Sequence, residues 1–385
     1  MTPRYRAAST TDAGIAVSNL NSEIAQLESA LVGDRGLSAG RLAELGERLT
    51  LRGQFLGRVA DYERASEFAE QGVRREPKSG VAWMARAKAR ATFHEFEAAL
   101  ADLDQAASRG VSSETDSVRA SIFQATGRYD EALLIRRPLS EAYPTIASVG
   151  AVASILAERG DWDAAETEFG EALALYRDVS PFPVAFLLHQ QGMMWMRAGD
   201  FERARDLLGQ ALAVLPVYAQ ASGHLAWIEA ALGHSEEARA RLEAVAEKAD
   251  DPEAAGFLAH VLQLAGRTAE AKVWRDAAAT QYEHLLARHP SAFLDHAATF
   301  WLSALGDPKR ALRLAKDNVE LRQTPMSWTL LMQAAQANGE TAIACRAARK
   351  ALGWGQPTSP RRALADRAAA ERVARGCDAL ALKGQ

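Results

Sequence analysis

The stretch Gly199-Asp-Phe201-Glu-Arg-Ala204 is the clearest copy of a phrase that recurs along the chain. The phrase is a turn residue, often an aromatic residue, two polar residues, and then alanine at the start of an apolar run. Its other copies are Asp61-Tyr62-Glu-Arg-Ala65, Phe96-Glu-Ala-Ala99, Gly127-Arg-Tyr129-Asp-Glu-Ala132, Gly160-Asp-Trp162-Asp-Ala-Ala165, Gly233-His-Ser-Glu-Glu-Ala238, Gly266-Arg-Thr-Ala-Glu-Ala271, Gly306-Asp-Pro-Lys-Arg-Ala311 and Gly339-Glu-Thr-Ala-Ile-Ala344. The intervals between the last alanines are 34, 33, 33, 39, 34, 33, 40 and 33 residues, which is a period with two insertions.

Each copy of the phrase has the chemistry of a tight turn between two helices. Glycine accepts the positive φ of such a turn, and acids in the first turn of the second helix complement its dipole. We expect the alanine where the two antiparallel helices cross closely. Prolines then end many units, at Glu76-Pro77, Tyr143-Pro144, Leu215-Pro216 and Gln356-Pro357.

The pattern resembles the tetratricopeptide repeat (TPR) family over about residues 39–357. Matching residues are Trp83, Gly192 and Trp195 in first helices, together with the loop glycines and aromatics and the unit-ending prolines. The resemblance implies an all-α fold, a right-handed superhelical solenoid of about nine helix-turn-helix TPR-like repeats. Such repeats stack into one continuous core, so the array is expected to be a single cooperative domain closed by atypical ends.

The ends predict the domain organisation. Residues 1–38 are expected to hold a flexible start and an N-terminal capping helix, because Ile15, Leu20, Ile24, Leu27 and Leu31 lie at helical spacing. Residues 39–357 form the solenoid. Residues 358–385 are expected to hold a C-terminal capping helix, with binding of a membrane or a regulatory protein by its basic face as the alternative.

Bulk composition excludes several classes of function. The 385 residues carry a formal charge of −4 with both signs interspersed, which argues against nucleic acid as the main partner. No apolar run is long enough to cross a membrane, and no export signal is visible. The two cysteines, Cys345 and Cys377, are far apart and are expected to be reduced and packed. These features predict a cytoplasmic location.

Motifs for catalysis are missing from the sequence, which predicts a protein that is no enzyme and has no cofactor. His94-Glu95 is followed by Phe96-Glu97 and so lacks the spacing of a zinc protease. The one alternative is a metal-binding protein or metal-dependent enzyme that uses the region of His260, His284, His289 and His296. Because His284 and His289 are five residues apart, they diverge by about 140° on a helix, so no metal site is assigned.

The first helices predict a groove with two halves, because in this family they line the concave surface. The first half is polar or small, with Glu47, Thr50, Gln54, Val81, Met84, Lys88, Glu114, Ser117, Ser121, Gln124, Ala147, Gly150 and Ser154. The second half is aromatic and is the candidate partner-binding groove, with Phe186, His189, Met193, Met196, Trp227, His260, Phe293, His296 and Phe300. The family's carboxylate clamp would need Lys, Asn and Arg, and of the corresponding residues only Lys88 fits.

An amphipathic helix does not place Phe, Trp and Met on a solvent face without a reason. The sequence therefore predicts a protein-protein interaction scaffold or adaptor that holds an extended or helical peptide in the concave groove. The alternative is internal packing, in which 178–184, the long second helix near 273–288 or over-packing covers the aromatic half. Self-association through 363–382 is a further possibility.

Overall fold

The computed structural model describes residues 10–31, 38–111, 113–303, 306–353 and 369–377, and within these ranges the chain is helical and contains no β-strand. The helices are α1 Ala13–Leu31, α2 Ala39–Leu56, α3 Val59–Arg75, α4 Gly80–Thr92, α5 Phe96–Ala107, α6 Ser113–Ala125, α7 Tyr129–Ala142, α8 Ile146–Arg159, α9 Trp162–Leu175, α10 Pro181–Arg197, α11 Phe201–Val214, α12 Ala219–Ala231, α13 Ser235–Ala246, α14 Glu253–Leu264, α15 Thr268–Arg288, α16 Leu294–Ser303, α17 Pro308–Leu321, α18 Pro325–Ala337 and α19 Thr341–Leu352. Residues 369–377 are also helical. None of these helices is both long and apolar enough to cross a membrane.

From α2 to α19 the helices pack as consecutive hairpins, each against the next. The predicted crossing alanines lie at the contact between the two helices of each hairpin. All nine are at most 5% exposed, namely Ala65, Ala99, Ala132, Ala165, Ala204, Ala238, Ala271, Ala311 and Ala344. A larger side chain there would push the helices apart, so the period seen in the sequence is a packing requirement.

The turns within the hairpins adopt the left-handed backbone that the phrase predicts. Positive φ values occur at Gly57, Gly127, Gly160, Gly199, Gly233, Gly266, Gly306 and Gly339. The α4–α5 turn lacks a glycine, and His94 takes this conformation instead, with φ of 58°. A non-glycine residue is uncommon there, so something else must hold His94 in place.

Buried ion pairs tie the helices of the first two hairpins together. Arg86 of α4 makes a two-pronged contact with Asp102 of α5, at 2.8 and 2.9 Å. Arg52 of α2 grips Asp61 of α3 in the same way, at 2.7 Å for both bonds. Both aspartates are 2% exposed, so each depends on its arginine for charge compensation.

The N-terminal helix α1 packs along α2 through Leu20, Ile24 and Leu27, while Ile15 stays 55% exposed. At the other end Ala370 is buried against the last hairpins. The rest of the expected C-terminal capping helix lies outside the described residues, and the domain boundaries drawn from the sequence stay a prediction.

The expectation that both cysteines are reduced is wrong. Cys345 of α19 and Cys377 form a disulfide, with Cα atoms 6.0 Å apart. Their separation of 32 positions in the sequence had suggested separate places in the fold. The helix of residues 369–377 packs against the end of the solenoid, which brings the two sulfurs together.

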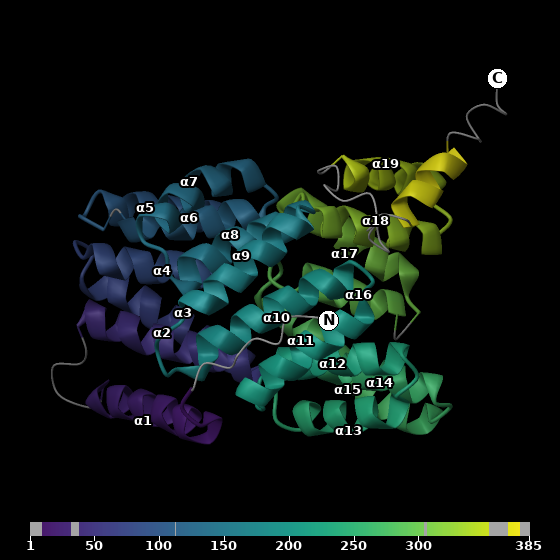
Figure 1. The fold of residues 1–385 in the computed structure, drawn as a ribbon, viewed down its shortest axis with the longest axis horizontal. Helices are drawn as coiled ribbons and strands as arrows, with labels where there is room; N and C mark the ends of the chain where they lie inside the picture. The colour runs from purple at the N-terminus through teal and green to yellow at the C-terminus, as the bar shows by residue number, and fades with distance from the viewer. Residues whose placement is uncertain (1–9, 32–37, 112, 304–305, 354–368, 378–385) are drawn as a thin grey trace.

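Figure 1 shows how the hairpins coil. Helices α2–α9 form one side of the molecule, α12–α19 form the other, and α10 and α11 lie between them. The coil is tight enough for α2 to contact α12. The groove of an open solenoid is therefore partly enclosed, which sets the geometry of the candidate site.

Candidate functional site

The inner surface is built by the first helix of each hairpin. In the second half α8 contacts α10, α12 contacts α14, α14 contacts α16, and α16 contacts α18. This layer carries the predicted groove residues. They differ widely in accessibility: His189 and Phe300 are buried, Trp227 and His296 are exposed, and Phe186, Met193, Met196, His260 and Phe293 are intermediate.

Phe300 is a core residue and does not offer a free face to a partner. It is 4% exposed, and its ring lies 5.0 Å from that of Tyr282 on α15 and 5.2 Å from that of Trp301. The long second helix is thus what covers it. Phe293, expected on the first helix of its unit, lies one residue before α16 begins.

Trp227 belongs to α12, but the residue of α12 that contacts the neighbouring first helices is His224. The Trp227 ring packs edge-on against Phe201 of α11, at 5.6 Å between centroids. His224, three residues earlier, lies 3.0 Å from His189 of α10 and faces Phe257 of α14. Hydrophobicity alone favours Trp227 over His224 as the inward-facing residue of this helix.

Tyr218, His189 and His224 form a chain of hydrogen bonds on the inner surface. The Tyr218 hydroxyl lies 3.2 Å from His189 Nδ1, and His189 Nε2 lies 3.0 Å from His224 Nδ1. Burial, reinforced by His224, lowers the pKa of His189. Burial, reinforced by His296 and Arg197, also lowers the pKa of His224, although Glu253 acts in the opposite direction. With both rings neutral, each imidazole has one donor and one acceptor nitrogen, so each of the two contacts can join a donor to an acceptor.

A second polar group joins α14, α16 and the end of α17. His296 Nδ1 lies 3.1 Å from a Glu253 oxygen, and Arg322 Nη1 donates to Asp295 at 2.8 Å. Burial opposes charge on all the carboxylates and on the imidazole, but their mutual attraction outweighs it. The pKa of His296 is raised to about 10, and those of Glu253 and Asp295 are lowered to about 2. His296 is therefore a cation at neutral pH, with a side chain 42% exposed.

Residues far apart in the sequence meet at one edge of the coil. The backbone amides of Asp250 and Asp251 donate to Gly57 O at 3.1 and 3.2 Å. In return the Asp250 carboxylate accepts hydrogen bonds from the amides of Val59 and Ala60, the first residues of α3. A side chain about 190 residues away thus caps α3, which has no cap of its own.

Two further contacts repeat this arrangement in the next hairpins. His94 Nδ1 lies 3.2 Å from Ser291 O, and Arg322 Nε donates to Ala125 O at 3.1 Å. The three contacts span 191, 197 and 197 residues. The α2–α3 turn thus meets the α13–α14 loop. The α4–α5 turn meets the α15–α16 loop, and the end of α6 meets the residue after α17. We call this set of contacts the edge contact.

Aromatic rings pack across the same boundary. Phe55 at the end of α2 lies 5.0 Å from Phe182 of α10 and 4.7 Å from Tyr218. Phe93 stacks on His289, with ring centroids 4.0 Å apart. The N-terminal hairpins therefore cover part of the aromatic inner surface of the second half.

An apolar pocket of about 180 Å³ remains on the inner surface between α8 and α10. Its lining is Ile146, Ala147, Gly150, Ala151 and Ser154 from α8 and Pro183, Phe186 and Leu187 from α10. A Cβ on Gly150 would lie 2.6 Å from a Leu187 methyl carbon, so glycine permits the close approach. The pocket lies where the predicted small half of the groove meets the predicted aromatic half.

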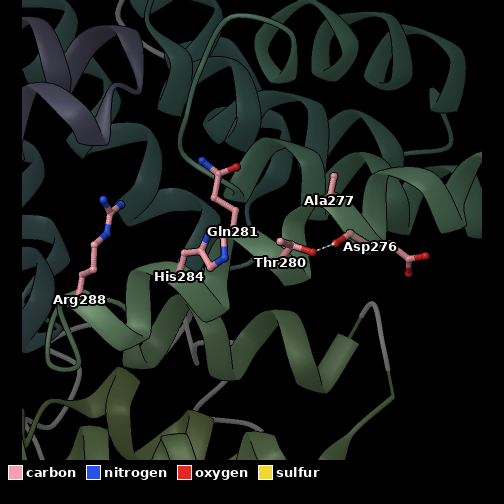
Figure 2. A pocket seen from close by; sticks show the side chains of 6 residues that line it. All are labelled: Asp276, Ala277, Thr280, Gln281, His284 and Arg288. Carbon is pink, nitrogen blue, oxygen red and sulfur yellow. Dashed lines mark hydrogen bonds between the residues drawn. The ribbon is translucent and has the colours of Figure 1, made fainter.

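A larger and shallower hollow of about 540 Å³ runs along one face of α15. Figure 2 shows its lining residues, among them Asp276, Thr280, His284 and Arg288 at successive turns of this helix. All the lining residues come from α15 itself. The hollow explains where His284 points, but it brings no second element to a ligand.

The four histidines of the metal alternative do not converge. His289 contacts Glu63 of α3 at 2.9 Å, and His296 contacts Glu253 of α14 at 3.1 Å. His260 lies on α14 and His284 on α15. Within the described ranges no group of three His, Cys, Asp or Glu residues is arranged to hold a metal ion.

Several residues of the inner surface were missed from the sequence. Tyr218, His224, Glu253 and Arg322 have short-range neighbours that look like ordinary helix residues. His224 carries a usable signal, because it lies 35 residues after His189, close to the repeat period. Asp250 carries none, because its partner on α3 depends on how the whole array coils.

The comparisons with known proteins concern this repeat architecture. A family model described as tetratricopeptide repeat matches residues 196–261. No protein with a curated description matches the chain. Among solved structures, human IFIT1 in a dimer with PPP-AAAA is 14% identical, with 90% of this chain and 95% of that chain covered and a TM-score of 0.47. Yeast Tom70 is 12% identical, with 95% and 93% covered and a TM-score of 0.36. The APC/C hetero-tetramer Cut9–Hcn1 is 13% identical, with 97% of this chain and 78% of that chain covered and a TM-score of 0.45.

The hairpins with their buried alanines and left-handed turns define an α-solenoid of helix-turn-helix repeats. A tetratricopeptide repeat model matches residues 196–261 of this array, and the repeat architecture that the sequence predicted is confirmed. The fold is a repeat scaffold, and its partner must be inferred from its own surface.

Proposed function

We propose that this protein is a non-catalytic scaffold that holds a peptide of a partner protein on its inner surface, anchored by one apolar side chain in the α8–α10 pocket. The pocket itself supports this function most directly. Its volume of about 180 Å³ is below the roughly 300 Å³ at which small-molecule sites begin. That size suits a single side chain of an extended or helical peptide.

The lining supports an apolar anchor rather than a charged one. Phe186 and Leu187 form one wall, and alanines and glycine form the other. Of the predicted groove residues, Phe186 lines this pocket, while Met193 and Met196 follow on the same helix. The remaining aromatic positions, including Trp227 and Phe300, stay a proposal as partner contacts, and the burial of Phe300 argues against its role.

The predicted absence of catalysis also remains a proposal, and it rests on the missing sequence motifs. Self-association through 363–382 also remains a proposal, because most of that stretch lies outside the described residues. The cytoplasmic location stays a prediction, and the Cys345–Cys377 bond argues against it because disulfides are rare in reducing compartments.

A displayed library of random peptides, selected on the purified protein, tests the function. We expect enriched peptides that share one apolar residue and bind at about micromolar affinity. Ala147→Phe, which fills the pocket from its exposed rim, should weaken binding at least tenfold. Ala174→Phe, on an exposed position of α9, is the matched control. Equal binding by both variants would contradict the proposal.

A further inference from the structure

The edge contact joins α4–α6 to hairpins with which they share no apolar core, whereas α2 and α3 share one buried cluster with α8–α12. The buried cluster of α4–α6, which includes Phe96, Leu103 and Ile122, is separate from the buried cluster of α16–α19. In the described ranges, Leu321 is the residue of the second half that packs against the α4–α6 cluster. Separating the edges at α4–α6 would therefore leave these two clusters intact, whereas at α2 it would part Phe55 from Phe182 and Tyr218 of the same cluster.

Charged groups supply much of the contact across this boundary, both in the edge contact and beside it. A Glu63 oxygen on α3 lies 3.0 Å from Arg288 and 2.9 Å from His289 at the end of α15. The Asp250 carboxylate holds the first amides of α3. Water can replace such partners when the edges part, so these contacts are reversible in a way that a buried apolar interface is not.

The apolar part of the boundary includes two sets of ring contacts. Phe55 packs on Phe182 and Tyr218, and Phe93 stacks on His289. All these rings except His289 are at most 9% exposed in the closed arrangement. Opening would therefore uncover a stripe of aromatic surface along α10 and α12.

We propose that the edge contact is a latch, which closes the N-terminal hairpins over the aromatic inner surface and opens as a unit to expose it. Each repeat contacts mainly its neighbours, so small rotations along the array add up to a large movement at the edge. Interfaces of this polar kind between parts of one chain commonly allow relative motion. The proposal does not depend on the α8–α10 pocket, which is open in the closed arrangement.

The test measures the distance across the latch in the full-length protein. Spin labels are placed on Glu67→Cys of α3 and Ala287→Cys of α15, both exposed positions. The native cysteines are joined to each other and do not take the label. Double electron-electron resonance should give one short distance for the otherwise unchanged protein. With Asp250→Ala, a longer distance should appear, and the ratio of open to closed molecules should rise roughly tenfold or more.

Asp200→Ala is the matched control. Asp200 caps its own helix α11 by accepting from the Arg203 amide at 3.2 Å, and it takes no part in the edge contact. A longer distance that appears equally in this variant would show general loosening and overturn the latch.

Glu63→Gln decides the matter if Asp250→Ala loses helicity by circular dichroism. The substitution removes the charge that faces Arg288 and His289 while keeping the shape of a half-buried side chain. We expect molecules with the longer distance to appear in this variant. Their fraction should increase with ionic strength. An unchanged short distance at low and high salt would contradict the proposal.

Discussion

His94 shows how one residue links local backbone to the coil of the whole array. Its φ of 58° places it where the other turns have glycine. The imidazole contact with Ser291 O, and the stacking of its ring on Phe96 at 5.2 Å, offset the strain of that conformation. A turn that looked like a defective copy of the repeat is therefore a contact point.

The stability of the protein should depend on the protonation of His94. Burial, reinforced by Arg322, lowers its pKa to about 4, although Asp295 acts in the opposite direction. As pH falls from 6.5 towards 4, His94 becomes protonated in the unfolded chain but stays largely neutral in the folded chain. The free energy of unfolding therefore decreases. We expect a loss of about 3 kcal/mol by pH 4, measured by urea unfolding at pH 7, 5.5 and 4.

His94→Asn separates this effect from those of other titrating groups. Asparagine tolerates positive φ and can donate to Ser291 O, but it does not titrate. Glu253 and Asp295, with pKa values of about 2, also lose stabilisation in acid, but they do so in both proteins. The same pH dependence in both proteins would show that His94 is not the group responsible.

At the scale of the helix pair, Asp102 should be far more important than a neighbouring acid on the same helix. Asp102 accepts from Arg86 and also from Arg90, and it is 2% exposed. Asp102→Ala leaves two arginines partly buried without their partner, which should cost about 3 kcal/mol. Asp104 pairs with Arg119 but is 68% exposed, so Asp104→Ala should cost about 0.5 kcal/mol or less.

Hydrogen exchange of α4 and α5 is the suitable measurement, because a long repeat array need not unfold in one step. The amides of these two helices should exchange much faster in Asp102→Ala than in Asp104→Ala. Similar rates in the two variants would mean that the buried ion pair does not hold this hairpin together.

The C-terminal helix should depend on its disulfide. Cys377→Ser removes the link to Cys345 of α19, and a cross-link of this loop size contributes about 3 kcal/mol. We expect faster exchange in residues 369–377 and in α19, with little change in α2–α15. A reducing agent should have the same effect on the unaltered protein and none on the variant. Protection that survives in both cases would show that packing of Ala370 suffices.

The helix pairs were predictable because their causes are local. A left-handed turn needs glycine, and a close crossing needs alanine, so both leave a mark every 33 or 34 residues. The direction in which a single side chain points from its helix was harder to predict. His224 rather than Trp227 meets the next inner helix, and Phe300 packs on Tyr282 of α15. The size and hydrophobicity of a side chain do not determine which face of a first helix points inward, because an insertion shifts the repeat.

At the scale of the molecule, the coil could not be predicted from the repeats. Its pitch is the sum of small rotations between neighbours, and no single repeat encodes it. The edge contact joins residues 191 to 197 positions apart, a separation that no local pattern marks. The open groove expected from the sequence therefore became a partly enclosed surface, and the pocket between α8 and α10 survived because it lies away from the edge.

This coil predicts that Phe55 controls the size of the protein more than its helicity. Its side chain is 2% exposed, but its ring partners Phe182 and Tyr218 belong to α10 and to the residue before α12. Phe55→Ala removes about 3 kcal/mol of packing across the boundary, while the core between α2 and α3 remains. Small-angle X-ray scattering should then show a larger radius of gyration with unchanged circular dichroism.

Phe169→Ala provides the comparison, because it removes an equally buried ring from α9, away from the edge contact. That variant should melt at a lower temperature and keep the radius of gyration of the unaltered protein. If both variants expand alike, the coil is held by the rigidity of every repeat. If Phe55→Ala alone expands, the coil is held at its edge, and the inner surface that the N-terminal hairpins cover becomes accessible when that edge parts.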